Sequence, residues 1–135
     1  MFVLDASMAL TWCFDDETSA GAESVLRRLL LEGAMAPGHW TLEVGNGLLA
    51  GHRRGRIDKA KLKATESLLA DLRVDVIAVD IAGTIQALHL AQQHDLTVYD
   101  AAYLHLAMTR GLGLATIDRE LAIACRKERV RVISS

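Results

Sequence analysis

The chain has 135 residues, of which 24% are charged, and its formal net charge is −2. This length allows one domain with a proper hydrophobic core, so we expect a single domain over residues 1–135. The charge excludes a polycation, and a nucleic-acid surface would have to be a local basic patch.

The two cysteines, Cys13 and Cys125, are far apart in the sequence and do not form a metal-ligand pair. Two such thiols are typical of a reducing cytosol rather than of a disulfide framework. Met1 leads directly into an apolar strand without a basic leader, and no apolar run approaches the length of a membrane span. The sequence therefore predicts a cytoplasmic protein without a membrane segment.

Short apolar runs and helical patterns alternate along the chain. The apolar runs predict strands at residues 2–4, 74–79, 113–117 and 130–133, with a weaker signal at 34–36. Helical spacing and cap residues predict helices at about 19–32, 40–51, 59–72, 81–94, 101–110 and 118–126, after a short helical or irregular connection at 6–14. This alternation predicts an α/β fold with three layers, α/β/α, around a central and mostly parallel sheet.

The helical patterns also predict which side chains face the core. The expected inward side chains are Ala22, Val25, Leu26, Leu29 and Leu30 in the helix at 19–32, Leu42, Leu48 and Leu49 in the next helix, and Ile85 and Leu88 in the helix at 81–94. On another side of the second helix, Glu43, Asn46, Gly47 and Ala50 recur three and four residues apart. That side is small and polar, which leaves space around one carboxylate.

Four acidic residues are expected at the same edge of this sheet. Asp5 and Asp118 each follow an apolar strand, whereas Asp100 and Glu43 lie close to the starts of helices. Strand ends and helix starts meet at the edge where open α/β sheets bind their ligands. Alternatively, Asp100 and Asp118 serve only as helix N-caps and Glu43 is an exposed helix residue. Asp5 fits no such alternative, because a buried charge needs a partner.

Four carboxylates in one pocket repel each other, and some would hold a proton at neutral pH. A hard divalent cation removes this conflict, and Mg²⁺ takes oxygen ligands, of which only one or two are direct carboxylates. Carboxylate sites of this type hydrolyse phosphodiesters by generating hydroxide from bound water. Ser7 and Thr116, each two residues from an acid, would orient these carboxylates or the bound waters.

Four short motifs around these acids resemble those of PIN domains, and in particular the small ribonuclease toxins of VapBC-type toxin–antitoxin pairs. The motifs are Val3–Ser7, Trp40–Asn46 around Glu43, Tyr99–Tyr103 around Asp100, and Ala115–Leu121 around Asp118. Each motif is short, but their order and spacing make the resemblance specific. It extends over essentially the whole chain, whose length is usual for this family.

The resemblance implies an endoribonuclease that uses Mg²⁺ or Mn²⁺ to activate a water and leaves 5′-phosphate and 3′-hydroxyl ends. By matching positions, the catalytic acids are Asp5, Glu43, Asp100 and Asp118. Asp5 and Asp100 would bind the metal directly, Asp118 would complete a second or weaker metal position, and Glu43 would orient the attacking water. Ser7, Thr116 and Asn46 are the expected supporting residues. The resemblance also implies a homodimer and a cognate antitoxin.

Basic residues supply candidate contacts to RNA phosphates. The candidates are Arg53, Arg54 and Arg56 in the most basic segment of the chain, and Arg119 beside Asp118. Such contacts would make RNA binding salt-dependent. Alternatively, the basic segment is solvated or meets an acidic partner, and Arg119 pairs with a local acid.

Three other ring side chains could suggest a site, but their surroundings favour other roles. His39 has helical spacing with Glu43, yet it is expected to precede the helix, and a hard cation does not need an imidazole ligand. Trp12 and Trp40 could stack on bases. Because both lie within apolar sequence, packing in the core or in an interface is the expected role.

Two other functions fit parts of this pattern. An aspartate after the first strand can be a phosphorylated nucleophile in a phosphate-transferring α/β domain. Such domains usually carry a second aspartate two residues later, where this chain has Ser7. The other alternative is a non-catalytic PIN-like module that binds RNA or protein, although an inactive scaffold has no physical reason to keep four mutually repelling carboxylates.

Overall fold

The computed structural model describes residues 1–134. Strands and helices alternate as expected. In chain order they are β1 (Val3–Leu4), α1 (Ala6–Thr11), the 3₁₀ helix η1 (Asp15–Glu17), α2 (Ala20–Glu32), β2 (Ala34–Pro37), α3 (Trp40–Arg53), α4 (Lys59–Asp71), β3 (Val74–Ile77), α5 (Ile81–His94), α6 (Val98–Arg110), β4 (Leu114–Ala115), α7 (Arg119–Lys127) and β5 (Val132–Ile133). No helix within these residues is long and apolar enough to cross a membrane.

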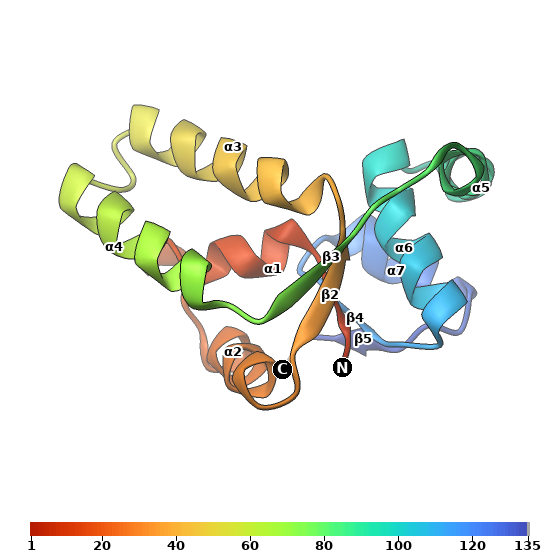
Figure 1. Cartoon of the computed structure of the whole chain (residues 1–135), viewed down its shortest axis with the longest axis horizontal. Helices are drawn as coiled ribbons and strands as arrows, with labels where there is room; N and C mark the ends of the chain where they lie inside the picture. Colours follow the sequence, from red (N-terminus) through yellow and green to blue (C-terminus); the bar gives the residue numbers. More distant parts are fainter. Residues whose placement is uncertain (135) are drawn as a thin grey trace.

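The five strands form one sheet with the order β3-β2-β1-β4-β5, and every neighbouring pair is parallel. Helices α1 to α4 lie on one side of the sheet and α5 to α7 on the other (Figure 1). The predicted three-layer α/β/α fold is therefore confirmed. The first strand is the centre of the sheet, where Val3 pairs with Met35 on one side and Leu114 on the other. This position explains the continuous apolar run before Asp5, because a central parallel strand is covered on both faces.

The strands are shorter than their apolar runs suggest. β4 contains only Leu114 and Ala115, and the chain leaves the sheet at Thr116, so that Ile117 is 51% exposed. β3 is an edge strand and ends at Ile77 rather than at Val79. Short central strands bring the polar residues that follow them directly to the carboxyl edge of the sheet.

Asp118 caps the start of a helix, whereas Asp100 lies inside the first turn of one. Asp118 is the N-cap of α7, and its Oδ1 accepts a hydrogen bond from the Leu121 amide at 2.9 Å. Asp100 is not a cap, because α6 begins three residues earlier than expected, with Thr97 as its N-cap. The Thr97 hydroxyl accepts from the Asp100 amide at 3.1 Å, which places Asp100 in the first helical turn.

Several leucines and isoleucines expected in the core are exposed. These side chains are Leu30, Leu42, Leu49, Ile85 and Leu88. Helix α3 instead buries Trp40, Val44 and Leu48, which recur every four residues, and α5 buries Ala87, Leu90 and Ala91. Leu48 is buried as predicted, but the other predicted side chains of α3 and α5 lie off the buried faces. In α5 the small residues Ala87 and Ala91 mark the buried face, rather than Ile85 and Leu88.

Two glycines let α3 pack tightly against the start of the chain. A Cβ atom at Gly47 would lie 2.5 Å from Leu10 Cδ1, and one at Gly51 would lie 2.3 Å from Phe14 Cε1. The Phe14 ring is buried, and the Arg56 guanidinium covers it at 4.3 Å from the ring centre. The ring therefore has no room to move aside.

Replacing Gly51 with alanine is expected to destabilise the protein by about 1–3 kcal/mol, because the added methyl group would overpack against Phe14. The matched control is Gly45→Ala, since a Cβ atom at Gly45 meets nothing within 4 Å on the same helix. That change should stabilise the fold by up to about 1 kcal/mol through helix propensity. Urea unfolding of both variants measures the difference, and equal stabilisation by both would contradict the tight contact between α3 and Phe14.

Candidate active site

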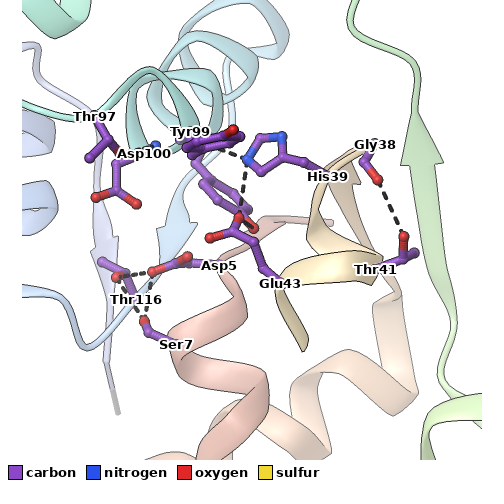
Figure 2. A network of polar contacts seen from close by, with 11 residues as sticks. Asp5, Ser7, Gly38, His39, Thr41, Glu43, Thr97, Tyr99, Asp100 and Thr116 are labelled. Carbon is purple, nitrogen blue, oxygen red and sulfur yellow. Dashed lines mark hydrogen bonds and ion pairs between the residues drawn. The ribbon is translucent and has the colours of Figure 1, made fainter. Parts of the chain in front are cut away.

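Asp5 lies at the carboxyl end of β1 and is 3% exposed. Its Oδ2 accepts hydrogen bonds from the hydroxyls of Ser7 and Thr116, each at 2.6 Å. Ser7 comes from α1 and Thr116 from the end of β4, so the two hydroxyls hold the carboxylate from two sides (Figure 2). Because both bonds end on Oδ2, the second oxygen of Asp5 is left for another partner.

The same two hydroxyls also fix the chain around Asp118. The Ser7 hydroxyl accepts from the Ile117 amide at 3.2 Å, and the Thr116 hydroxyl accepts from the Asp118 amide at 2.9 Å. These bonds tie the ends of the neighbouring strands β1 and β4 to each other. The positions of Asp5 and Asp118 are therefore coupled through Ser7 and Thr116.

Glu43 lies in the first turn of α3 and has two partners of its own. The Tyr103 hydroxyl, from α6, donates to Glu43 Oε1 at 2.7 Å. His39 Nε2 lies 3.1 Å from the same oxygen and 3.0 Å from the Tyr99 carbonyl oxygen. Glu43 is thus held by residues from both helical layers.

Asp100 faces the three other acids. Burial, together with the negative charges of Asp5, Asp118 and Glu43, raises the pKa of the Asp100 carboxyl to about 6. Figure 2 shows the carboxylates of Asp5, Glu43 and Asp100 turned toward a common space. The structure therefore brings the four predicted acids to one edge of the sheet.

Local contacts shift the pKa values of the other acids in different directions. Burial raises the pKa of Asp5, and the hydrogen bonds from Ser7 and Thr116 offset this only in part. Burial also acts on Glu43, but the bonds from His39 and Tyr103 outweigh it and lower its pKa. These shifts favour the ionised form of Glu43, whereas they make Asp5 and Asp100 easier to protonate than a free carboxyl.

The oxygen ligands at this edge suit a hard cation that keeps most of its waters better than an ion enclosed by protein side chains. Among residues 1–134, no group of three or more His, Cys, Asp or Glu side chains lies close enough to hold one ion together. Mg²⁺ keeps several waters and binds proteins through one or two carboxylates, so it does not require such a cage. The ligands available at this edge are carboxylate and hydroxyl oxygens. A bound cation would lower the raised pKa values of Asp5 and Asp100, because it favours their ionised forms.

The acidic helix η1 neutralises part of the basic segment. Arg56 pairs with Asp16 at 2.9 Å and with Glu17 at 3.0 Å, and Lys61 lies 3.3 Å from Asp15. Arg56 is therefore already engaged by two carboxylates. This was not expected from the sequence, in which the acidic turn and the basic segment are some forty residues apart.

Arg54 and Arg56 both line a groove of about 280 Å³, together with Ser7, Glu17 and Ile117. They differ in pairing, because Arg56 alone of the two has carboxylate partners within residues 1–134. Because Ser7 binds Asp5, this groove adjoins the acidic site. Arg53, Arg54 and Arg119 are exposed, and Asn46 is exposed one turn beyond Glu43.

No role of Tyr103, and no contact between His39 and Glu43, was predicted from the sequence. His39 precedes α3, as expected, and its four-residue spacing from Glu43 was the available signal. Tyr103 follows Asp100 by three residues, which places both on one face of α6. Trp12 and Trp40 are buried, in agreement with the expected packing role.

Comparison with known proteins places the fold in a family. The PIN domain family matches residues 2–127, which is nearly the whole chain. The chain belongs to the PIN domain family. The resemblance expected from the four motifs is therefore confirmed.

One curated protein is similar to this PIN domain over part of its length. It is named Exonuclease VapC9, from Pyrobaculum aerophilum, and it is 35% identical over 85 residues, or 62% of this chain. The matched stretch spans 61% of the length of that relative.

Solved structures agree with the fold. The crystal structure of PAE2754 from Pyrobaculum aerophilum has a TM-score of 0.68 at 25% identity and covers 98% of this chain and 90% of its own. A toxin–antitoxin complex from Klebsiella pneumoniae has a TM-score of 0.62 at 14% identity and covers 90% of each chain. The second likeness shows the fold alone.

The burial of Asp100 and its repulsion by the other acids predict a pH-dependent stability in the absence of metal. A carboxyl with a higher pKa in the folded than in the unfolded state destabilises the fold as it ionises, here from pH 3.8 up to about 6. The full shift in the pKa of Asp100 would correspond to a loss of about 3 kcal/mol of folding stability. Solvent screening at this partly exposed site reduces it to about 1 kcal/mol.

Asp100→Asn should therefore stabilise the metal-free protein by about 1 kcal/mol more at about pH 7.5 than at about pH 4. Chemical unfolding in EDTA at both pH values measures this. The control is Asp75→Asn, which removes a charge from the exposed edge strand β3. If both variants had the same pH dependence, the four acids would not repel one another as described.

Proposed function

We propose that this PIN domain is an endoribonuclease that depends on Mg²⁺ or Mn²⁺ and acts as the toxin of a toxin–antitoxin pair. The observation that supports this most directly is the convergence of four carboxylates at one edge of the sheet. Each of Asp5 and Glu43 has one oxygen fixed by two hydrogen-bond partners, so both acids have defined orientations. The similarity to Exonuclease VapC9 supports the same reaction class.

Each acid has a distinct proposed role. Asp5 and Asp100 would hold the cation, and Asp118 would complete a second or weaker metal position. When bound, the cation supplies a hydroxide from water at neutral pH and offsets the charge on the departing oxygen. Glu43 is ionised and orients the attacking water. Ser7 and Thr116 fix the orientation of Asp5, and Asn46 would support the site from α3.

The proposed RNA path runs from the acids toward the exposed arginines. Arg54 lines the groove beside Ser7, Arg53 precedes it on α3, and Arg119 follows Asp118. Arg56 contributes less to this surface, because Asp16 and Glu17 already neutralise it. Arginine contacts with phosphates position RNA without reading its sequence.

The proposal includes a cognate antitoxin and a homodimer. A hollow of about 540 Å³ between α5 and the start of α6 is lined in part by the exposed apolar side chains of Val79, Val98 and Tyr99, which supports a protein contact on this face. Ile81, Ile85 and Leu88 of α5 are also exposed. The resemblance to the toxins of VapBC pairs, which agrees with the name of the curated relative VapC9, supports the antitoxin partner.

The purified chain, free of any partner, is expected to cleave RNA with Mg²⁺ or Mn²⁺ and not with EDTA. Asp100→Asn and Asp5→Asn should each reduce the rate by more than about a hundredfold, because even a residue that only supports a metal ligand contributes 10- to 100-fold. Gel analysis and mapping of the new 5′ ends measure this. Linear and circular RNA, and DNA of the same sequence, are compared.

The arms of this experiment separate the possible outcomes. Cleavage of circular RNA requires an endonuclease, whereas an exonuclease would digest only the linear form. Mn²⁺ should also raise the melting temperature of the wild type, by binding only the folded state, and should not do so for the double variant at Asp5 and Asp100. A folded chain that binds Mn²⁺ but cuts none of these substrates would instead favour the non-catalytic binding module.

Arg54→Ala is expected to weaken RNA binding by roughly tenfold at low salt and to reduce the slope of log affinity against log salt by about one. The control, Arg27→Ala, removes the same charge from α2, where Arg27 is exposed. Binding is measured in EDTA, so that the RNA is not cut. Equal effects of the two changes would mean that only net charge matters, and would contradict the proposed path.

A further inference from the structure

We propose that Tyr103 and His39 are positioning residues that hold Glu43 so that only its second oxygen, Oε2, is available to the reacting water. This inference rests on the proposed nuclease function. It assigns to the two residues a role in the reaction rather than in folding alone. It depends on the positions of His39, Glu43 and Tyr103.

The contact between Tyr103 and Glu43 joins two layers that lie on opposite sides of the sheet. Glu43 belongs to α3 and Tyr103 to α6, and these helices are separated by the strands (Figure 1). The contact therefore passes over the carboxyl edge of the sheet, where the acids converge. The Tyr103 side chain is fully buried, so its hydroxyl position is fixed by the packing of α6.

The contacts of His39 define which ring nitrogen carries a hydrogen. Nε2 lies within hydrogen-bond distance of the Tyr99 carbonyl oxygen and of Glu43 Oε1. A carbonyl oxygen accepts only, and so does an ionised carboxylate. Nε2 must therefore carry a hydrogen, which it shares between the two acceptors. His39 thus links the first turn of α3 to the first turn of α6, close to Asp100.

These contacts define which oxygen of Glu43 faces the site. Tyr103 and His39 both bind Oε1, and among residues 1–134 no hydrogen bond reaches Oε2. A glutamate on a helix surface has several rotamers, and the nearby carboxylates of Asp5 and Asp100 would repel it toward solvent. The two donors oppose that repulsion, so they keep Glu43 near the other acids. A base that must orient a water depends on this placement, because a shift of about 1 Å can cost a hundredfold in rate.

Tyr103→Phe tests this proposal because it removes one oxygen atom and keeps the buried ring. We expect kcat to fall about tenfold with little change in KM, which is the rate equivalent of one hydrogen bond to a charged group. In the Glu43→Gln background the same change should cost less than about twofold, because Tyr103 acts through Glu43. Losses that multiply independently in the double variant would overturn the proposal.

His39 is tested by a pair of substitutions. His39→Gln keeps an N–H donor of similar reach, whereas His39→Ala removes it. The glutamine variant should retain at least about half of the wild-type kcat and the alanine variant about a tenth. The control on α6 is Thr109→Val, which removes a hydroxyl bonded only to the Leu106 carbonyl, as far as residues 1–134 are concerned, and should leave kcat unchanged. Equal rates for the two His39 variants would overturn the role of His39.

A measurement without metal or RNA tests the contact itself. The chain has two tyrosines, so a sample with ¹³Cζ-labelled tyrosine gives two NMR signals. Glu43→Gln should move the Tyr103 signal, whereas Glu23→Gln, on the distant helix α2, should not. An unmoved Tyr103 signal would overturn the proposal.

The two readouts separate failure of this inference from failure of the proposed function. A wild type that cuts no nucleic acid overturns the nuclease and the positioning role together, even if the NMR contact is present. A wild type that cuts RNA, with a Tyr103→Phe variant of equal kcat, overturns the positioning role alone. A drop in kcat with an unchanged melting temperature and a moved Tyr103 signal supports both.

Discussion

Electrostatic repulsion among four carboxylates is the constraint on which the rest of this structure depends. Asp5, Glu43, Asp100 and Asp118 converge at one edge of the sheet, where burial together with the charges of the other three acids raises the pKa of Asp100 to about 6. A folded chain can tolerate such a cluster only if other contacts hold each acid in place. Ser7 and Thr116 do this for Asp5, Tyr103 and His39 do it for Glu43, and the Leu121 amide of α7 does it for Asp118. These polar contacts thus offset the repulsion among the acids.

The sheet topology explains why the acids meet there. The chain runs from β1 through β2 to β3 on one side and then returns to β4 and β5 on the other, so the strand order reverses at β1. Parallel sheets leave a crevice at such a reversal, outside the carboxyl ends of the strands. Because β1 and β4 contain two residues each, the polar residues after them reach this crevice directly. Helix α3 then brings Glu43 from one layer, and α6 brings Asp100 from the other.

The sequence predicted this architecture because it depends on local patterns. Apolar runs end at Asp5 and near Asp118, and strand ends share an edge in any parallel sheet. The start of α6 could also have been read from the sequence, because Thr97 followed by Asp100 has the spacing of a capping box. The helix faces could not, because glycine and alanine determine the close contacts of α3 and α5, while Leu42 and Ile85 are exposed. The contact of Glu43 with Tyr103 could not be predicted either, because Tyr103 is 60 residues away in the sequence and lies in the opposite helical layer.

The structure removes an apparent conflict between a structural and a chemical role for these acids. Asp118 caps α7, which from the sequence was an alternative to a place in the metal site. The cap uses Oδ1 alone, just as Asp5 is held through Oδ2 and Glu43 through Oε1. A carboxylate has two oxygens with about four acceptor positions, so one oxygen can stabilise the fold while the other remains available. The same division in three of the four acids also suits Mg²⁺, which takes single carboxylate oxygens and completes its octahedral shell with water. Folding contacts and site chemistry therefore reinforce each other, because fixing one oxygen orients the other.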